Sequence, residues 1–391
     1  MAVGGRTRVL HVLPDLAIGG GQTIVLNHVR HADRSRFDVD VVQLHPADDL
    51  APAFAEAGSP PELLPTPPSP RTVAELRRRV RRTDVVHVHS DQDRKLAQLA
   101  ALGTGVPVVG HLHAEWVHLG PKVPAGASTA RRARGRALGA VRDAVERRTV
   151  AHYVAESADV ARLFRPLVTQ PVTVLRQAIP VDRFDGAARR AAAAGLRAAL
   201  RPGPGPVLVN VSRMVPGKGH LHLLEAFRAL LDAQPTATLV LVGDGPERGA
   251  VERRAGELGV EGALRLLGNR HDVPEVLSLA DVFVFASESE GFGLAVLEAM
   301  AATKPVVAFR LPAVEEFATD GESALLVDRG DVPAFAAAVQ KVLADPALAS
   351  ALGRSGRATV ERRFPADAVA RTFEEVYDEV LAGRRREGGR R

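Results

Sequence analysis

The chain has 391 residues, 46% of them hydrophobic, which is enough for two domains with cores of their own. It contains no cysteine, which excludes disulfides, thiolate metal sites and cysteine nucleophiles. The net charge of +5 suits anionic ligands, but basic and aromatic residues are not interleaved as a nucleic-acid surface requires, so no nucleic-acid partner is expected. No apolar run is long enough to cross a bilayer and no secretory leader pattern is visible, so the expected location is cytoplasmic.

Short segments rich in valine and leucine alternate with helical patterns along the first half of the chain. This alternation is typical of a parallel sheet that helices cover on both faces. The predicted strands are Arg8–Leu13, Asp38–Leu44, Asp84–Val88, Pro107–Leu112, Thr149–Val154 and Val172–Leu175, and the predicted helices include Thr23–Val29, Thr72–Arg82 and Asp91–Leu102.

An alanine- and arginine-rich segment, Asp185–Pro206, interrupts this rhythm and ends in a Pro/Gly run, which predicts a domain boundary. A second series of strands follows, and two helices are predicted near Val332–Leu343 and Ala366–Leu381. The expected fold class is α/β, with two doubly wound Rossmann-like domains that face a cleft and bind ligands beyond the carboxyl ends of their strands. The second-series strands are Val207–Val211, Thr238–Val242, Ala263–Leu267, Asp281–Ala286, Pro305–Phe309 and Ala324–Val327.

Glycine-rich and charged loops follow several of these strands. The cluster Gly19–Gly21 precedes a helix, where backbone amides can approach an anion, although a plain tight turn explains it equally well. In "SRMVPGKGH", Arg213 and Lys218 could reach one diphosphate, or be two solvated cations. The stretch "ESEGFGLAVLEAMAA" places Glu290 in a loop and Glu298 in the following helix. These two carboxylates could each hold the hydroxyls of a sugar, or be ordinary surface charges.

Several segments decide between these alternatives, because in order and spacing they resemble the family-4 retaining glycosyltransferases of the GT-B fold. The resemblance covers nearly the whole chain, and the two glutamates with their Gly-Phe-Gly are its most specific part. It is carried by "SRMVPGKGH", "LVGDGPER", "LLGNRHDVPEVLSLADVFVFAS", "ESEGFGLAVLEAMAATKPVVA" and "DGESALLV", and in the N-terminal half by "HVLPDLAIGGGQ", "DVVHVHS" and "VPVVGHLHAEW".

The resemblance implies roles for five charged or titratable residues. Glu298 resembles the glutamate that holds the ribose hydroxyls of the nucleotide, and Glu290 the one beside the donor sugar. Arg213 and Lys218 resemble the pair that binds the diphosphate and stabilises its charge as it leaves. His113 matches a histidine that faces the donor sugar from the acceptor side. The predicted catalytic residues are therefore Glu290, His113, Arg213 and Lys218.

The resemblance also implies contacts through the backbone. Amides near Gly293 would hold sugar hydroxyls and phosphate, the Gly268–His271 loop would touch the base, and the Gly19–Gly21 loop would close over the phosphates. Asp91, Arg94 and Trp116 would line the acceptor side, although Trp116 could equally serve packing. The predicted donor site comprises Gly20, Gly21, Arg213, Lys218, Gly268, Asn269, Arg270, Glu290, Gly291, Phe292, Gly293, Leu294 and Glu298.

The implied domains are an acceptor-binding domain at 1–182, a nucleotide-sugar-binding domain at 183–363, a helix at 364–382 that packs back on the first domain, and a disordered basic tail at 383–391. The implied reaction moves a hexose or N-acetylhexosamine from a nucleotide diphosphate sugar, with UDP favoured, to a hydroxyl acceptor. It retains the anomeric configuration and needs no cofactor. Gln177, Thr303 and Ala324 replace residues that are usual in the family, which leaves the donor open.

Other functions remain as alternatives. An epimerase of the same fold would act on a nucleotide sugar without an acceptor, and a non-catalytic partner would only bind one. His87, His89, His111, His113 and His118 look like a zinc set, but alternation along a strand explains the His-x-His pairs, and no metal is predicted. The basic runs Glu75–Arg82 and Ala130–Arg148 could lie on an anionic membrane, although a solvated face is favoured.

Overall fold

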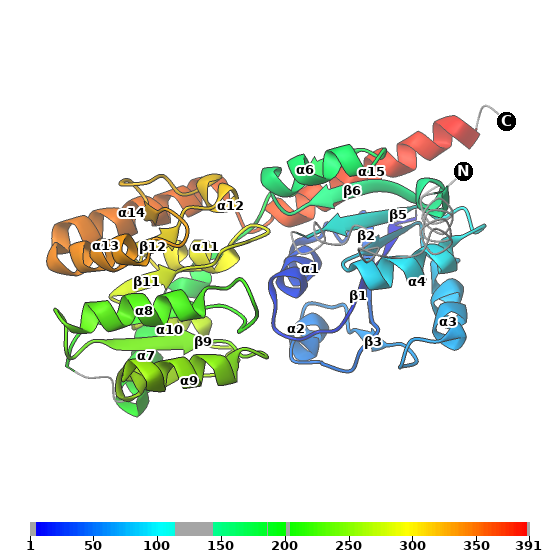
Figure 1. Cartoon of the computed structure of the whole chain (residues 1–391). Coiled ribbons are helices and arrows are strands. Elements are labelled where there is room, and N and C mark those ends of the chain that lie inside the picture. Colours follow the sequence, from blue (N-terminus) through cyan, green and yellow to red (C-terminus); the bar gives the residue numbers. More distant parts are fainter. Residues whose placement is uncertain (1–4, 114–143, 186, 201–203, 389–391) are drawn as a thin grey trace, which may run out of the picture. The chain divides into compact units, whose positions relative to one another are not determined.

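The computed structural model describes residues 5–113, 144–185, 187–200 and 204–388 (Figure 1). The chain divides into two compact units. Unit 1 consists of Met1–Ala178 together with Ala366–Arg391, and unit 2 of Ile179–Pro365. The C-terminal segment therefore belongs to the same unit as the N-terminal half of the chain.

Unit 1 is built on a seven-stranded sheet with the order β3-β2-β1-β4-β5-β6-β7. All of its strand pairs are parallel, so their carboxyl ends meet at one edge. The strands are β1 (Thr7–Leu13), β2 (Phe37–Gln43), β3 (Glu62–Leu63), β4 (Val85–Val88), β5 (Val108–Leu112), β6 (Val150–Ala155) and β7 (Val172–Val174). The helices are α1 (Gly20–His31), α2 (Ala51–Glu56), α3 (Pro70–Val80), α4 (Asp91–Ala101), α6 (Ala158–Phe164) and α15 (Ala368–Gly388).

The two faces of this sheet differ in chemistry because successive side chains of a strand point to opposite sides. Leu10 and Val12 of β1 pack in an apolar core that includes residues of α3, α4 and α6. His11, between them, points to the other face, where its ring lies near those of His28 on α1 and Phe373 on α15. A buried group of imidazoles therefore packs on that face together with aliphatic side chains such as Val9 and Leu13.

Unit 2 has a six-stranded parallel sheet with the order β10-β9-β8-β11-β12-β13. Its strands are β8 (Val207–Val211), β9 (Thr238–Val242), β10 (Leu264–Leu266), β11 (Val282–Phe285), β12 (Val306–Phe309) and β13 (Leu325–Val327). Its helices are α7 (Ala187–Leu200), α8 (His220–Leu231), α9 (Arg248–Leu258), α10 (Val273–Ser278), α11 (Leu294–Ala301), α12 (Pro312–Glu315), α13 (Val332–Ala344) and α14 (Pro346–Arg363). Short 3-10 turns occupy Arg165–Leu167, Val181–Phe184 and Glu261–Ala263.

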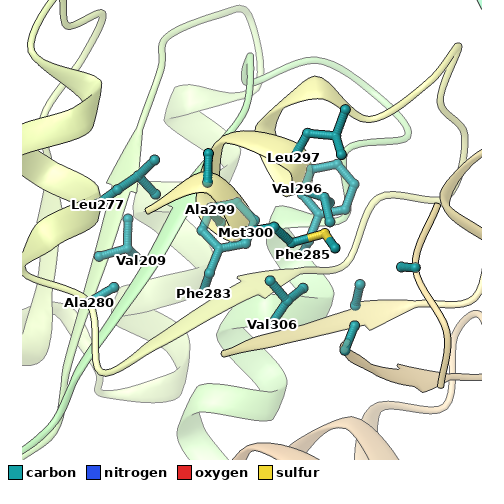
Figure 2. Close-up of a cluster of buried hydrophobic side chains, with 14 of the residues drawn as sticks. Val209, Leu277, Ala280, Phe283, Phe285, Val296, Leu297, Ala299, Met300 and Val306 are labelled. Atoms are coloured by element: carbon teal, nitrogen blue, oxygen red, sulfur yellow. The ribbon is translucent and has the colours of Figure 1, made fainter. Parts of the chain in front are cut away.

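Apolar layers cover both faces of the second sheet. On one face Phe283 and Phe285 of β11 pack with Leu277 of α10 and with Val296 and Met300 of α11 (Figure 2). On the other face the core consists of residues from α8, α9 and α13. This two-sided burial explains why the strands read as nearly continuous apolar runs, and it holds α11, which follows β11, against the sheet.

Some features differ from the sequence prediction. The short edge strand β3 and the helix α14 were not predicted. Gly353 and Gly356 weaken the helical pattern of α14, yet a Cβ on Gly353 would lie 2.4 Å from the carbonyl oxygen of Thr303, so glycine permits the close packing. The helix α15 continues to Gly388, so residues 383–388 are helical rather than disordered, in keeping with the good helix propensity of arginine and glutamate.

Among the described residues, no single helix is long and apolar enough to cross a membrane. One bent pair, Val332–Ala344 with Pro346–Arg384, passes such a test by length and composition alone, with a bend of 102° between its parts.

Candidate functional site

The predicted donor residues of unit 2 gather where the strand order reverses. β8 and β11 are neighbours in the sheet, while the helices and strands that follow them lead to opposite sides. Loops that follow two such strands begin side by side at the carboxyl edge, which is where open α/β sheets bind ligands. Here the two loops are residues 212–219 and 286–293.

A partly buried ion pair joins the two loops. The Nζ of Lys218 lies 2.8 Å from Oε1 of Glu290 and also donates to the carbonyl oxygen of Ser289 at 3.4 Å. Only 17% of the Lys218 side chain and 13% of the Glu290 side chain are exposed. Two charges held together in a partly desolvated place stay ordered, so an ammonium and a carboxylate are presented at fixed positions.

Backbone contacts hold the loops in register. The amide of Glu288 donates to the carbonyl oxygen of Gly217 at 2.8 Å, and the hydroxyl of Ser287 donates to the same oxygen at 3.2 Å. Gly219, the N-cap of α8, lies against the carbonyl group of Ala286, which directly follows β11. The position of Lys218 therefore depends on the chain staying close to β11 on both sides of it.

Replacing Gly219 by alanine is expected to destabilise unit 2 several times more than replacing Gly217 by alanine. Both glycines have a left-handed backbone, with φ of +67° and +86°, which costs alanine about 1–2 kcal/mol. Only at Gly219 would the added Cβ also meet backbone, because it would lie 1.8 Å from the carbonyl oxygen of Ala286. Urea denaturation followed by circular dichroism measures both losses, and equal losses would contradict the proposed contact.

The helix α11 begins directly after the Gly-Phe-Gly stretch. Gly293 is its N-cap, with φ of +98°, and no side chain caps this end. The ring of Phe292 is buried and stacks on Phe317 with 5.0 Å between the centroids, so it anchors the loop in the core. The backbone is thereby fixed at the start of the helix, where the helix dipole favours an anion or a hydroxyl oxygen.

Glu298 lies on α11 and is only partly exposed. Its burial raises the pKa of the carboxyl group to about 7, and the charge of Arg183 opposes that rise. The group is therefore divided between its protonated and ionised forms near neutral pH. Shifts of this size in a partly buried carboxyl group are typical of functional sites.

The remaining donor-site residues of unit 2 lie in nearby strand-end loops. Arg213 is exposed and follows β8. Gly268 pairs with Gly243 through an amide-to-carbonyl bond of 2.8 Å, and Asn269 beside it is exposed. The guanidinium of Arg270 donates to both carboxylate oxygens of Asp272, which leaves the backbone of this loop as its contact surface.

In unit 1 the predicted residues also gather at a reversal of strand order, here between β1 and β4. Gly20 and Gly21 begin α1, whose N-cap Gly19 has no side-chain cap. His113 follows β5, and a Cβ on Gly21 would lie 3.4 Å from its Cε1. The glycine turn and the histidine ring therefore face each other at the carboxyl edge of this sheet.

The predicted acceptor-side residues are only partly described. Asp91 begins α4, and Trp116 and His118 lie outside the described residues. The Nη1 of Arg94 donates to the hydroxyl group of Tyr153 at 3.0 Å and lies 3.5 Å from Oε1 of Glu146. Arg94 is thus part of a buried polar network as well as a predicted acceptor contact, and its acceptor role stays a prediction.

The imidazoles of unit 1 form a hydrogen-bonded core. Nδ1 of His11 lies 2.8 Å from Nε2 of His89, and Nε2 of His11 lies 2.8 Å from Nδ1 of His28. One nitrogen each of His11, His87 and His89 lies within 4.8 Å of the others, a grouping that could hold a metal ion. His11 already uses both nitrogens, however, so a metal would have to break one of these bonds. The prediction that the chain needs no metal stays a prediction.

The basic run Glu75–Arg82 on and after α3 is largely engaged within unit 1. Arg78 pairs with Glu75, Arg79 pairs with Glu62 and Glu75, and Arg77 donates to two backbone carbonyl groups. The interpretation as a solvated face stays a prediction, and residues 130–143 of the second run lie outside the described part of the chain.

Two family models match the two halves of the chain. Residues 18–183 match the model described as Glycosyltransferase Family 4, and residues 196–359 match the model described as Glycosyl transferases group 1. The chain belongs to the family-4 glycosyltransferases. The models end close to the division between the two units, so each unit corresponds to one of them.

Curated relatives of this family-4 glycosyltransferase match it over about half of their own length. The lipopolysaccharide core biosynthesis glycosyltransferase LpsE of Rhizobium meliloti is 36% identical over 183 residues, which is 47% of this chain and 52% of that protein. The N-acetyl-alpha-D-glucosaminyl L-malate synthase of Bacillus anthracis is 30% identical over 175 residues, or 45% of this chain and 46% of that protein.

Solved structures show that the glycosyltransferase has the GT-B fold. HepE of Anabaena, in complex with UDP and glucose, has a TM-score of 0.80 at 19% identity, and the match covers 95% of this chain and all of that one. The sucrose-phosphate synthase of Thermosynechococcus elongatus has a TM-score of 0.76 at 21% identity over 97% of this chain and all of that one. At these identities the likeness concerns the fold alone.

Sequence reasoning missed two polar residues beside the glycosyltransferase's predicted site. Glu156, directly after β6, contacts Nδ1 of His113. His220 is the first residue of α8, and its Nε2 lies 3.0 Å from the hydroxyl oxygen of Ser212. The hydroxyl group of Ser212 donates to Oδ1 of Asn210. Their position after a strand was the available signal, because any polar residue at that edge of a parallel sheet lies near the ligand.

Proposed function

We propose that this glycosyltransferase moves a hexose or N-acetylhexosamine from a nucleotide diphosphate sugar to a hydroxyl acceptor, with retention of configuration and without a metal ion. The observation that carries the proposal is the Lys218–Glu290 pair at the strand-order reversal of unit 2, beside an uncapped helix N-terminus. A cation, a carboxylate and free amides in one place match a ligand with a diphosphate between two sets of hydroxyls.

In the proposed reaction the diphosphate leaves with negative charge while positive charge builds on the sugar. Lys218, Arg213 and the first amides of α11 would stabilise the leaving group without reorganising. Glu290 would hold a sugar hydroxyl, and Glu298 the ribose hydroxyls. No second carboxylate acting as an acid is needed, since a diphosphate is already a good leaving group, and it would accept the proton of the acceptor.

UDP is the favoured nucleotide. The HepE structures in the comparison contain UDP, UDP-glucose, or UDP with glucose. A relative named as GDP-mannose-dependent, from Mycolicibacterium smegmatis, is 36% identical over 190 residues, so GDP-mannose stays open. The named products of the relatives range from lipopolysaccharide core to a malate glycoside, so we leave the acceptor at the class of hydroxyl compounds.

A thermal-shift panel of nucleotides and nucleotide sugars, with and without magnesium, tests the donor proposal. A ligand that binds only the folded state stabilises it by about 2.7 kcal/mol at a hundredfold excess over its Kd. We expect the nucleotide diphosphates and diphosphate sugars of one base to raise the melting temperature without magnesium. If no nucleotide or nucleotide sugar raised it, the proposal would be refuted. Incubating the shifting sugar alone then separates transfer from epimerisation, because an epimerase would convert it without an acceptor.

Nucleotide-sugar affinity is expected to depend on pH through Glu298. If the ribose hydroxyls donate to its ionised form, only the ionised fraction binds well, and the pKa of about 7 predicts that fraction. Affinity should then fall about tenfold between pH 8 and pH 6, and level off above pH 8. Isothermal titration calorimetry with UDP-glucose measures this, because a nucleotide sugar lacks the terminal phosphate that titrates near pH 6 in free UDP.

Glu298→Gln is the control for this pH dependence. The variant should bind UDP-glucose with the weak affinity that the wild type has at low pH, and with no change between pH 6 and pH 8. A pH dependence that survives in the variant would assign it to another group.

A further inference from the structure

The strands β5 and β6 bring His113 and Glu156 together by sheet register. Leu112 and Ala155 are partners across the two parallel strands, so the next residue of each leaves the sheet at the same place. The amide of Glu156 donates to the carbonyl oxygen of Leu112 at 3.3 Å, which continues the pairing. The strand register and the backbone hydrogen bond therefore place His113 beside Glu156, independently of the conformations of their side chains.

Both ring nitrogens of His113 face hydrogen-bond acceptors. Nδ1 contacts Oε1 of Glu156, and Nε2 lies 3.1 Å from the carbonyl oxygen of His89. A carbonyl oxygen only accepts, and so does an ionised carboxylate. Neutral histidine has a single N–H, so one of the two contacts would lack a proton. The His113–Glu156 pair must therefore hold one proton more than a neutral imidazole beside a carboxylate.

The surroundings favour this protonated pair. The two side chains are only 18% and 14% exposed, so their mutual attraction is little screened. The other imidazoles around the ring, His87, His89 and His111, are fully buried, and burial holds the pKa of each well below its usual range. They are neutral at pH 7, and among the described residues Glu156 is the charged group whose contact with the His113 ring is defined.

The backbone of Glu156 is fixed as well. Its carbonyl oxygen accepts from Nε2 of Gln177 at 3.0 Å, and Ser157 after it caps α6 by accepting from the amide of Val160. The ring of His113 is stacked on His111, with 4.7 Å between the centroids, and faces Gly21 of the glycine turn. Carboxylate and ring therefore keep one geometry.

We infer that Glu156 is a positioning residue that keeps both nitrogens of His113 protonated, so that His113 acts as a hydrogen-bond donor and not as a general base. The inference rests on the proposed function in one respect, namely that a hydroxyl group of a bound substrate replaces the carbonyl oxygen of His89 at Nε2. A ring without a free lone pair cannot take the acceptor's proton, which agrees with the proposed transfer of that proton to the leaving diphosphate.

The ring-nitrogen shifts of His113 test the inference without any turnover. The full chain is labelled with ¹⁵N-histidine, and the His113 signals are those that the His113→Gln variant lacks. At pH 7.5 the wild type should show two protonated nitrogens, and Glu156→Gln should show one. Glu146→Gln, which removes a carboxylate from the Tyr153 network of the same unit, should leave the His113 signals unchanged. A neutral ring in the wild type, or no change in Glu156→Gln, would overturn the inference.

The pH profile of transfer supplies the second readout. Glu156→Gln should lose activity as the pH rises, by about tenfold per pH unit once its histidine is deprotonated, while the wild type shows no such fall. A loss that is equal at all pH values would mean a merely structural role and overturn the inference. Absence of transfer in the wild type would refute the proposed function, and the nitrogen shifts alone would then decide this inference.

Discussion

Glu290→Gln is expected to lower kcat by about 10²- to 10³-fold, the usual loss when one group that stabilises a transition state is removed. The amide oxygen of glutamine can still accept from Nζ of Lys218, so the loop should keep its form. Nucleotide affinity should stay within about threefold or improve slightly, because a negative charge near the diphosphate is removed. Steady-state kinetics and calorimetry with the same nucleotide sugar measure the two quantities.

Glu288→Gln is the matched control in the same loop. The Glu288 side chain is 45% exposed and lies 3.4 Å from Nδ1 of His222. Its turnover should equal that of the wild type. Unchanged turnover in Glu290→Gln would remove Glu290 from the proposed chemistry, and a parallel loss of nucleotide binding would mean that the carboxylate supports the loop instead.

The strands were predictable because a parallel sheet that is buried on both faces requires strand sequences that are mostly apolar. Segments such as Val207–Val211 and Asp281–Ala286 are mostly apolar, and the observed strands β8 and β11 match them to within a residue or so. The meeting of the loops at 212–219 and 286–293 followed from the doubly wound order, since reversal of that order fixes which strand ends are neighbours. Tertiary contacts help to explain why α14 escaped prediction, because Gly353 weakens the helical pattern and yet permits close packing on Thr303.

The sequence predicted which residues belong to the candidate site, but not which of their side chains contact each other. Sequence could place Lys218 and Glu290 on neighbouring strand ends, yet the 2.8 Å ion pair depends on how the two loops are joined through Gly217. Glu156 escaped notice because nothing in "YVAESADV" separates it from a surface glutamate before a helix. Only the register of β5 with β6 brings it to His113. The raised pKa of Glu298 likewise comes from burial, which a helical pattern alone does not specify.

The free energy of unfolding of unit 1 is expected to fall steeply below pH 6.5 because its imidazole core is neutral. Burial is the largest cause that lowers the pKa of His11, His87, His89 and His111 well below the usual value, and it lowers that of His28 to about 3. Each group has its ordinary pKa of 6.5 when unfolded, so acid protonates the unfolded chain first. The stability is complete above pH 6.5 and is lost toward the lower folded pKa values.

The slope identifies the groups responsible. Each histidine that binds a proton only in the unfolded state contributes about 1.4 kcal/mol per pH unit, so five together can exhaust a stability of about 5–15 kcal/mol within two pH units. Hydrogen exchange of peptides from each unit should therefore show unit 1 opening between pH 5 and pH 6. Among the described residues of unit 2, the buried histidine is His220, whose pKa burial lowers to about 4, so unit 2 should open at lower pH.

A matched pair on α1 tests whether the buried imidazoles cause this loss. His28 is fully buried against His11, whereas His31 at the end of the same helix is exposed. His28→Gln should reduce the pH slope of the unfolding free energy by about 1.4 kcal/mol per pH unit, whatever it does to stability at pH 8, and His31→Gln should leave the slope unchanged. If both variants kept the wild-type slope, acid sensitivity would have to come from carboxylates, which titrate lower. The imidazole face beneath α15 would then be a neutral packing layer with no bearing on how the enzyme responds to acid.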